Sequence, residues 1–335
     1  MILVTGATGL VGSHLLYFLM KKNAKVKAIY RTKNKLQQVK NVFSYYGENN
    51  QTLFDKIEWI EADITDVFSL TNAFKNVTQV YHAAALISLN SKDYVEMRKI
   101  NIEGTANVVN LCIENKIEKL CYVSSIASLG KSSSKKIIDE NSEWDTEQNN
   151  STYAITKYGA ELEVWRGSQE GVPVVIVNPG VILGSGFWNS GTGKIFDKMY
   201  NGLSYYSKGI TGFIGVEDVA KVMVKLMESS IINERYILVA ENLSYKTVFF
   251  EIANCFNVKK PSILVKPWMS AVFWRFETIK SWLFSTTPLI TESSAKSMHN
   301  KRNYSSEKIK NQLNYNFTKI DKVIAKVCKH YLQDN

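Results

Sequence analysis

The stretch ILVTGATGLVG at residues 2–12 runs from a short apolar segment straight into three evenly spaced glycines. The apolar part predicts a strand, and residues 13–22 carry apolar side chains at helical spacing, so the glycines lie in the turn between a strand and a helix. Glycines there allow a tight turn, close approach of backbone to a pyrophosphate, and close packing of helix on strand. The helix N-terminus adds N–H donors. We therefore predict a dinucleotide-binding loop made by Gly6, Thr8, Gly9, Leu10, Val11 and Gly12.

The same alternation of strands and helices continues beyond this unit. Further strands are expected at 26–30, 57–62, 77–83, 119–125 and 174–177, with helices at 67–74, 94–114 and 153–168. Repeated alternation of this kind predicts an α/β Rossmann fold, a doubly wound parallel sheet with ligands at the carboxyl ends of its strands.

The pattern loosens after about residue 180. A helix at 217–229 and a strand at 235–239 are followed by a mainly helical, aromatic region. We predict an NAD(P)-binding domain over 1–180, with part of 210–240 crossing back to it, and a smaller, mainly helical substrate-binding lobe over 181–335.

Charge and composition restrict the possible partners. The chain has 335 residues and a net charge of +10, but its basic residues are scattered rather than grouped, so we expect a small-molecule substrate and no nucleic acid. No apolar run reaches the ~20 residues of a membrane span. The nearest region, 263–290, is interrupted by charged side chains; it either touches a membrane surface or lines an apolar substrate site.

Cysteine usage points to a reducing compartment. The four cysteines include no CxxC pair, and the first strand begins at residues 1–2, which leaves no room for a signal peptide. We therefore expect a cytoplasmic protein with free thiols.

The ends of the second and third strands are expected to select the cofactor. A carboxylate after the second strand would bind the ribose of NAD, but the sequence there is Tyr-Arg-Thr-Lys at 30–33. Arg31 can stack on adenine and pair with a 2′-phosphate, so NADP(H) is favoured and NAD(H) is the alternative; a solvated Arg31 is the other interpretation. Asp63 and Ile64 are placed to bind the adenine amine and pack its ring, although Asp63 could instead cap the next helix, in competition with Thr65 and Asp66.

Tyr153 and Lys157 form the predicted proton-transfer pair. Residues four apart lie on one helix face, and an ammonium beside a phenol favours the phenolate and lowers its pKa from the ordinary ~10. Ser125, at the end of the strand 119–125, is expected to donate to the substrate oxygen. Ser124 and Ser128 compete for that role, and a capping role is the alternative for all three.

Seven segments together resemble the extended short-chain dehydrogenase/reductase superfamily, also called the NAD-dependent epimerase/dehydratase family. They are TGATGLVG (5–12), ADITD (62–66), YHAAA (81–85), NIEGT (101–105), YVSS (122–125), YAITK (153–157) and VNPGVILG (177–184). The resemblance covers most of the chain and is strongest over 1–220.

The resemblance implies further roles. It places Ala83, Ala84, Ala85 and Ser124 at the cofactor, Pro179, Val181 and Ile182 around the nicotinamide, Tyr153 beside the cofactor, and Lys157 on the nicotinamide ribose. Asn101 would support the active-site network, and His82 would be structural, so no metal is expected. Such proteins often pair through two long helices, here 94–114 and 153–168, which implies a homodimer.

Within the family, Arg31 and VNPGVILG are more similar to dihydroflavonol, cinnamoyl-CoA and aldehyde reductases and 3β-hydroxysteroid dehydrogenases than to nucleotide-sugar epimerases. Gly215 stands where the family usually has an acid, which puts one substrate contact in doubt. The leading hypothesis is an NADP(H)-dependent oxidoreductase that acts on the carbonyl or alcohol of a small organic substrate with Tyr153 as general acid/base.

Two other functions remain open: a nucleotide-sugar epimerase or dehydratase with retained NAD, and a non-catalytic dinucleotide-binding protein. Aromatic residues of the smaller lobe indicate an apolar substrate or, alternatively, ordinary helix core. They are Trp268, Phe273, Trp274, Trp282 and Phe284.

Overall fold

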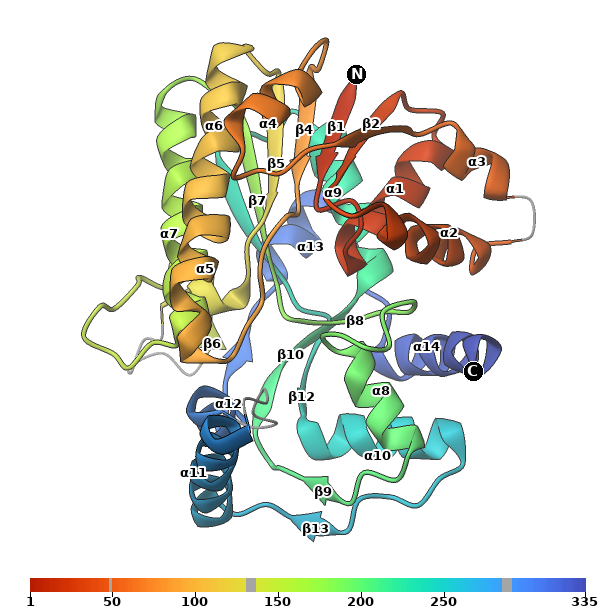
Figure 1. Ribbon diagram of the computed structural model, residues 1–335, viewed down its shortest axis with the longest axis vertical. Helices are drawn as coiled ribbons and strands as arrows, with labels where there is room; N and C mark the ends of the chain where they lie inside the picture. Colours follow the sequence, from red (N-terminus) through yellow and green to blue (C-terminus); the bar gives the residue numbers. More distant parts are fainter. Residues whose placement is uncertain (48–49, 131–136, 285–290) are drawn as a thin grey trace.

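The computed structural model describes residues 1–47, 50–130, 137–284 and 291–335, with the backbone alone for 279–284. Its main feature is a seven-stranded sheet in the order β11-β7-β5-β4-β1-β2-β3, in which all paired neighbours run parallel (Figure 1). The strands are β1 (Ile2–Thr5), β2 (Val26–Tyr30), β3 (Glu58–Glu61), β4 (Gln79–His82), β5 (Lys119–Val123), β7 (Val174–Pro179) and β11 (Glu234–Leu238). The predicted Rossmann fold is confirmed.

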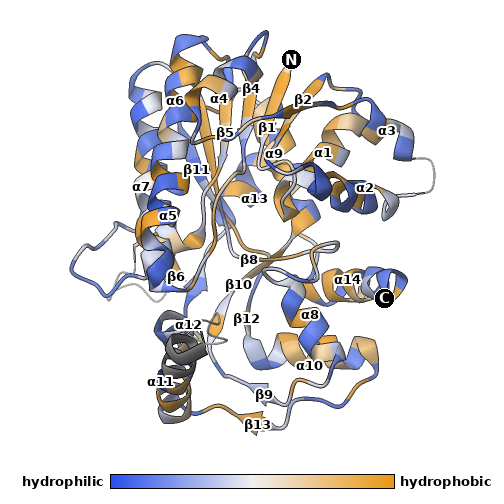
Figure 2. Cartoon of the chain, viewed as in Figure 1, coloured by the Kyte–Doolittle hydropathy of each residue, from blue (hydrophilic) through white to orange (hydrophobic). Residues whose placement is uncertain are grey.

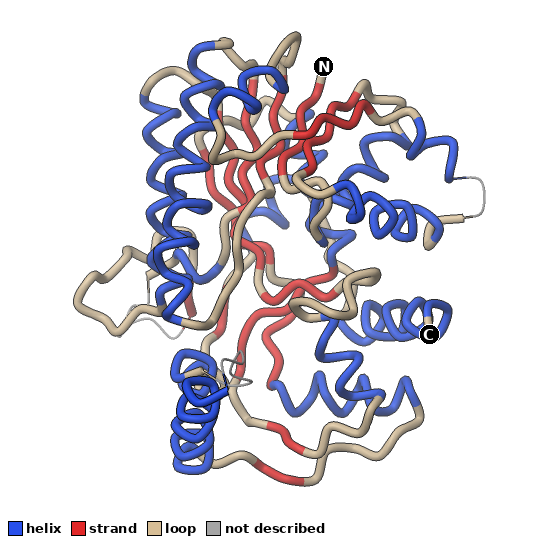
Figure 3. Tube along the Cα trace, viewed as in Figure 1, coloured by secondary structure: helices blue, strands red, loops and turns tan. Residues whose placement is uncertain are grey.

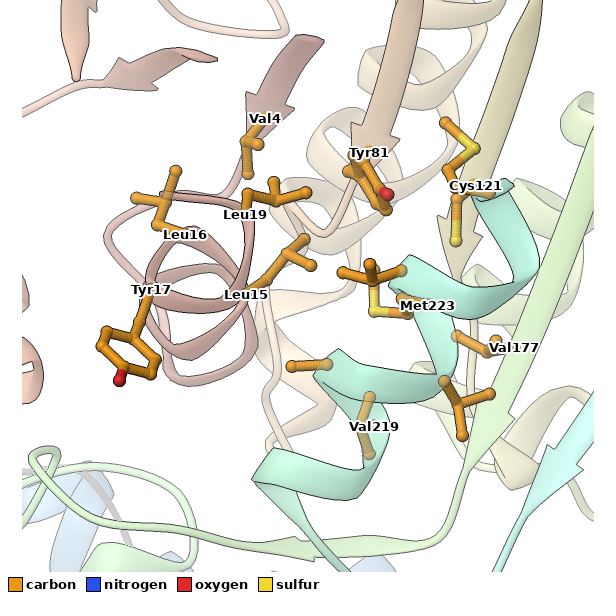
Figure 4. Packing of buried hydrophobic residues seen from close by; sticks show 14 of the residues in the cluster. Val4, Leu15, Leu16, Tyr17, Leu19, Tyr81, Cys121, Val177, Val219 and Met223 are labelled. Atoms are coloured by element: carbon orange, nitrogen blue, oxygen red, sulfur yellow. The ribbon is translucent and has the colours of Figure 1, made fainter. Parts of the chain in front are cut away.

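Two apolar layers hold this sheet, because successive strand residues point to opposite faces. On β1, Val4 joins a cluster with helices α1 (Leu10–Lys21) and α9 (Val216–Glu228), and Figure 4 shows side chains of this cluster meeting between the two helices and the strands. Leu3 joins the opposite cluster, with α4 (Val67–Ala73), α6 (Gly104–Glu114) and α7 (Thr152–Gln169). Each fully buried Val or Leu contributes about 1.5–3 kcal/mol.

The helix expected over 94–114 is divided. It consists of α5 (Tyr94–Arg98), a π-helical turn over Lys99–Glu103, and α6. The wider turn contains Asn101, whose buried side chain bonds to other segments of the chain. Such turns often mark functional sites in otherwise regular helices.

Two helices between β2 and β3 were missed by the sequence analysis: α2 (Leu36–Ser44) and α3 (Gln51–Asp55). The first of them buries Val39, Val42 and Phe43, and their spacing of three and one residues places them on one helix face. The sequence contains this pattern, but it extends over only five residues, which is too short to predict a helix.

The smaller lobe has its own sheet and core. Its sheet has the order β12-β10-β8, formed by β8 (Val181–Leu183), β10 (Ile210–Gly215) and β12 (Glu241–Ser244). Helices α8 (Gly193–Tyr200), α10 (Tyr245–Phe256) and α14 (Ile320–Asp334) cover it. Figure 3 shows this second set of strands beyond the carboxyl ends of the main sheet.

Short elements complete the chain: paired strands β9 (Tyr205–Tyr206) with β13 (Ile263–Leu264) and β6 (Ile137–Ile138) with β14 (Asn303–Tyr304), and helices α11 (Pro267–Phe284), α12 (Glu292–Ser297) and α13 (Glu307–Leu313). The strands of the main sheet are strongly apolar, whereas α11 carries both polar and apolar residues (Figure 2). Among the described residues, no helix combines the length and apolarity needed to cross a membrane.

Candidate active site

The predicted site residues gather at the carboxyl ends of four neighbouring strands. In the sheet order, β7, β5, β4 and β1 lie side by side, and they lead into Pro179, Ser124–Ser125, Ala83 and Gly6. This is the edge at which parallel α/β sheets bind ligands. The tertiary structure therefore brings together segments that are about 170 residues apart in sequence.

The glycine loop has the geometry that a pyrophosphate requires. Gly6 has a φ of +67°, and a Cβ at this position would lie 2.5 Å from the backbone of Ala83 and Ala84. A Cβ on Gly12 would lie 2.2 Å from the Gly6 carbonyl oxygen. Gly9 occupies the N-cap of α1 with no side-chain cap, so the first N–H groups of the helix are left for a ligand.

The segment after β4 is fixed against this loop. Ala83 donates its N–H to the Thr5 carbonyl at 3.2 Å, and the Ala84 N–H reaches the Thr5 hydroxyl at 3.4 Å. Asn101 then bonds to both the N–H and the carbonyl of Leu86 and donates to Thr156, next to Lys157. Asn101 thus ties the segment of Ala83–Ala85 to helix α7, in keeping with the supporting role implied for it.

Arg31 and Asp63 lie together at the end of β2 and β3. Arg31 Nη1 is 3.6 Å from Asp63 Oδ2, and Asp63 also accepts from the N–H and hydroxyl of Thr65. Although partial burial raises the pKa of Asp63, these bonds and the Arg31 charge outweigh it and hold the pKa below its usual range. Asp66, not Asp63, caps α4.

Ile64 packs against α6. It is 5% exposed, and a Cβ on Gly104 would meet its Cδ1 at 2.7 Å. Its contact with adenine stays a prediction.

Tyr153 and Lys157 lie on the inner face of α7, which Ser151 caps by accepting from the Ala154 N–H. Lys157 is fully buried and donates to the Tyr122 hydroxyl at 2.7 Å and the Val123 carbonyl at 2.9 Å. Its nitrogen also lies 4.5 Å from the centre of the Tyr122 ring. Tyr122, which sequence reasoning passed over, is therefore the direct partner of the lysine.

The pKa of Tyr153 differs from the sequence expectation. Burial raises it to about 12, and a hydrogen bond from Ser125 opposes that rise only in part. Burial also lowers the pKa of Lys157 to about 7, against the attraction of Glu161. Lys157 was expected to lower the pKa of Tyr153, but it does not. Its ammonium is directed at Tyr122 and Val123, and desolvation dominates the pKa of both Tyr153 and Lys157.

Ser125 is the serine placed beside Tyr153. Its hydroxyl also accepts from the Ala127 N–H at 3.1 Å, so the predicted capping role is present as well. Ser124 and Ser128 instead donate to Glu161, at 2.6 and 2.7 Å, and are buried.

Glu161 is the central residue that the sequence analysis missed. Its carboxylate accepts from Ser124, Ser128, Asn178 (2.9 Å) and Arg235 (3.1 Å) while only 2% of its side chain is exposed. Asn178 also donates to the Ser125 carbonyl, and the Ser128 hydroxyl lies 2.7 Å from that carbonyl as well as from Glu161. The signal was available, since Glu161 lies four residues after Lys157 and eight after Tyr153 on the same helix face.

His82 is held between two hydroxyls. Its ring nitrogens lie 2.6 Å from the Thr5 Oγ1 and 2.9 Å from the Thr105 Oγ1, and burial lowers its pKa to about 3, so it is neutral at physiological pH. Among the residues the structure describes, no three His, Cys, Asp or Glu side chains are grouped so as to hold a metal.

The segment after β7 connects the main sheet to the smaller lobe and passes close to α1. Pro179 ends β7, and Val181 and Ile182 belong to β8, which leads to Gly184, where a Cβ would lie 2.9 Å from Leu10 of the phosphate loop. The three predicted nicotinamide contacts therefore lie on a segment that returns to α1.

Gly215 is a packing position. It ends β10, and a Cβ there would lie 2.9 Å from Val323 of α14. The resembled family usually has an acid at this position. Here glycine stands in its place, and the C-terminal helix packs closely against it.

Comparison with known proteins agrees with this geometry. The model of the NAD dependent epimerase/dehydratase family matches residues 2–238. The chain is 27% identical over 279 residues to a putative dihydroflavonol 4-reductase of Synechocystis sp., covering 81% of this chain and 76% of the relative. It is 25% identical over 316 residues to cinnamoyl-CoA reductase 1 of Petunia hybrida, covering 86% and 91%. The crystal structure of gox2253 superposes with a TM-score of 0.81 at 27% identity, covering 100% of this chain and 98% of that one.

Proposed function

The chain belongs to the NAD-dependent epimerase/dehydratase family, and we propose that within it the protein is an NADPH-dependent reductase of a carbonyl group. Family membership makes it an NAD(P)-dependent enzyme of the extended short-chain dehydrogenase/reductase type. One observation carries the proposal: Ser125, Tyr153 and Lys157 lie together at the strand ends that also hold the glycine loop. The names of the relatives quoted above support a reductase.

The residues present suit a nicotinamide dinucleotide. The uncapped N-terminus of α1 would bind the pyrophosphate, Asp63 the adenine side, and Lys157 the nicotinamide ribose. When bound, the reduced cofactor supplies a hydride to the carbonyl carbon.

Tyr153 is suited to act as the acid in this reduction. With a pKa of about 12 it keeps its proton at neutral pH and can give it to the oxygen on which negative charge develops. The Ser125 hydroxyl beside it orients the same oxygen. Lys157, buried and with a pKa of about 7, gains protonation when anionic ligand groups approach, and its ammonium then stabilises the tyrosinate left behind.

The preference for NADPH rests on the segment after β2. Arg31, Lys33 and Lys35 are exposed there, and no acid lies between residues 24 and 47. A guanidinium pairs well with a 2′-phosphate, whereas the hydroxyl pair of NADH calls for a carboxylate at this place.

The test is fluorescence titration with NADPH and NADH of the wild type, Arg31→Glu and, as matched control, Arg98→Glu. Arg31 and Arg98 have the same side-chain exposure, 55%, and each lies beside one carboxylate. We expect NADPH to bind at least about tenfold tighter than NADH, and only Arg31→Glu to lose this preference, because a charged hydrogen bond contributes about 1.5–3 kcal/mol.

Catalysis is tested in parallel on a panel of aldehydes and ketones. Tyr153→Phe is expected to lower kcat by about 10²–10⁴ while leaving NADPH affinity within about threefold, since it removes only the transferable proton. Turnover of no carbonyl, together with tight NAD that stays bound through purification, would instead support an epimerase or dehydratase. Cofactor binding with no turnover at all would support a dinucleotide-binding protein.

We also propose that the chain forms a homodimer through α6 and α7. Large apolar side chains are exposed on α7 and on the neighbouring α5: Ile155 (39%) and Leu162 (48%) on α7, and Val95 (77%) on α5. Sedimentation of the wild type and of Leu162→Glu tests this, because a charge in an apolar interface opposes association.

A further inference from the structure

Helix α11 exposes apolar side chains and buries polar ones. Trp268, Val272 and Phe276 follow one another at intervals of four residues, so they form one stripe along the helix. They are 65%, 47% and 67% exposed, whereas Ser270 and Glu277 on the opposite side are 3% and 8% exposed. Surface helices of globular proteins ordinarily bury the apolar stripe and expose the polar one.

The buried polar side of α11 is fixed to the protein. The Ser270 hydroxyl donates to the Pro267 carbonyl and lies 2.8 Å from His299 Nε2. Helix α12 packs on α11 as well. Because the contact with His299 and the packing of α12 hold the helix in this orientation, the outward apolar stripe belongs to the folded state. The expectation that these aromatics form ordinary helix core is wrong for Trp268 and for Phe273, which is 47% exposed. Trp282 and Phe284 lie outside the described side chains.

The exposed charge on the segment that leads into and carries the stripe has one sign. Between residues 257 and 278 the exposed ionisable side chains are Lys259, Lys260, Lys266 and Arg275, and the single acid, Glu277, is buried. Arg275 lies 4.7 Å from the Trp274 ring, on the stripe's edge. The nearest exposed acid on α12, Glu292, is already paired with Lys296 at 2.7 Å. A surface that combines exposed aromatic and basic side chains complements an anionic lipid bilayer.

The stripe lies where a flat surface could reach it. Helix α11 and the β9–β13 pair lie at the end of the molecule opposite the seven-stranded sheet (Figure 1). The β9–β13 pair adds Tyr205 and Ile263, 52% and 41% exposed and directly opposite each other in register. The glycine loop leads into α1, which lies on the seven-stranded sheet and away from α11 (Figure 1), so contact at this end leaves the loop open.

We propose that this end of the molecule, centred on Trp268, Val272 and Phe276, docks on the surface of an anionic phospholipid bilayer. The aromatic side chains enter the headgroup region, and the four basic residues contact the lipid phosphates. The docking places the proposed carbonyl reductase at the phase in which apolar carbonyl compounds dissolve.

The experiment is co-sedimentation of the full-length protein with vesicles of phosphatidylcholine alone or with roughly 30% phosphatidylglycerol. Wild type, the double variant Trp268→Ser/Phe276→Ser and the control Phe68→Ser are compared. Phe68 is 88% exposed on α4, beside the seven-stranded sheet. Its replacement therefore also removes an exposed aromatic side chain, but one far from the stripe (Figure 1). NADPH affinity of each variant reports that the protein is folded.

We expect binding to the anionic vesicles that falls with added salt and that the double variant weakens about tenfold or more, with Phe68→Ser unchanged. No binding of the wild type, or equal binding of the double variant and Phe68→Ser, would overturn the proposal. So would loss of self-association in the double variant without vesicle binding, which would assign the stripe to a second copy of the chain. A raised KM for an apolar carbonyl without vesicle binding would overturn it too, by assigning the stripe to the substrate site.

Discussion

At the scale of single residues, the carboxylate of Glu161 decides how Ser125 is held. It accepts from hydroxyl, amide and guanidinium groups that come from the turn after β5, from β7 and from β11. Asn178 also donates to the Ser125 carbonyl, and the Ser128 hydroxyl lies within 2.7 Å of both that carbonyl and Glu161. A buried charge with this many donors is stable only while all of them are present.

Replacing Glu161 by Gln should therefore loosen Ser125 without touching the cofactor loop. An amide N–H₂ would face hydroxyl and amide donors, and Arg235 would lose its carboxylate partner while keeping its bonds to the Glu140 carbonyl. We therefore expect a loss of about 2–4 kcal/mol in unfolding free energy. We also expect kcat to fall about tenfold with NADPH affinity unchanged, because Ser125 orients the reacting oxygen in the proposed reaction.

Urea denaturation and steady-state kinetics measure the two effects. The matched control is Glu163→Gln on the same helix, which pairs with Arg166 at the surface and should stay within about 0.5 kcal/mol of the wild type. An E161Q protein with wild-type kcat would contradict the positioning role.

At the scale of elements, the β1–α1 unit separates two uses of glycine. Gly12 is needed by the fold, since a Cβ there would meet the Gly6 carbonyl oxygen at 2.2 Å. Gly9 has an ordinary φ of −99° and its Cβ would meet only that oxygen, at 3.3 Å. Gly9 is therefore needed chiefly for whatever approaches the N-terminus of α1.

This difference predicts that two alanine variants lose different properties: Gly9→Ala loses cofactor affinity and Gly12→Ala loses stability. Gly9→Ala should keep its thermal stability within about 1 kcal/mol and bind NADPH at least about tenfold more weakly, because the added methyl stands where the pyrophosphate approaches. Gly12→Ala should lose about 1–3 kcal/mol of stability, because backbone must move. Thermal unfolding and cofactor titration check both, and equal loss of stability in the two variants would refute the division.

At the scale of the whole molecule, buried histidines join the two lobes. His14 of α1 lies 3.2 Å from the Ser185 carbonyl, and His330 of α14 lies 2.8 Å from the Ser185 hydroxyl. The His330 ring stacks on Tyr45 at 4.3 Å, and Trp188 donates to Asp334 at 2.7 Å. The C-terminal helix thus links the loop after β8 to α1 and the segment after α2.

These histidines predict sensitivity to acid. Burial lowers the pKa of His14 and His330 to about 4 and that of His82 to about 3, below the ~6.5 of the unfolded chain. Between pH 6.5 and 4 the unfolded state binds more protons than the folded state. The free energy of unfolding is therefore highest above pH ~6.5 and decreases as the pH falls below it. Each group contributes up to about 1.4 kcal/mol per pH unit.

Urea denaturation from pH 8 to 5 measures this slope. His330→Gln, which can still bond to Ser185, should remove about a third of it. A stability that stays constant from pH 6.5 to 5 would show that these rings take up protons in the folded state at no cost.

The sequence by itself determined the parallel sheet, the glycine turn between β1 and α1, and the face of α7 that carries Tyr153 and Lys157. Each of these depends on residues within one or two turns of one another, so periodicity and glycine placement are sufficient to predict it. The spacing of four between Tyr153 and Lys157 holds in any helix, whatever packs around it.

Only the tertiary structure decided which serine lies beside Tyr153, why Ile64 is covered, and which way α11 faces. These outcomes depend on contacts such as that of Arg235 with Glu161, 74 residues apart, and that of Ser270 with His299. The pKa of Tyr153 was mispredicted for the same reason: the effect of a neighbouring charge can be read from spacing, but the desolvation that outweighed it depends on everything folded around the phenol.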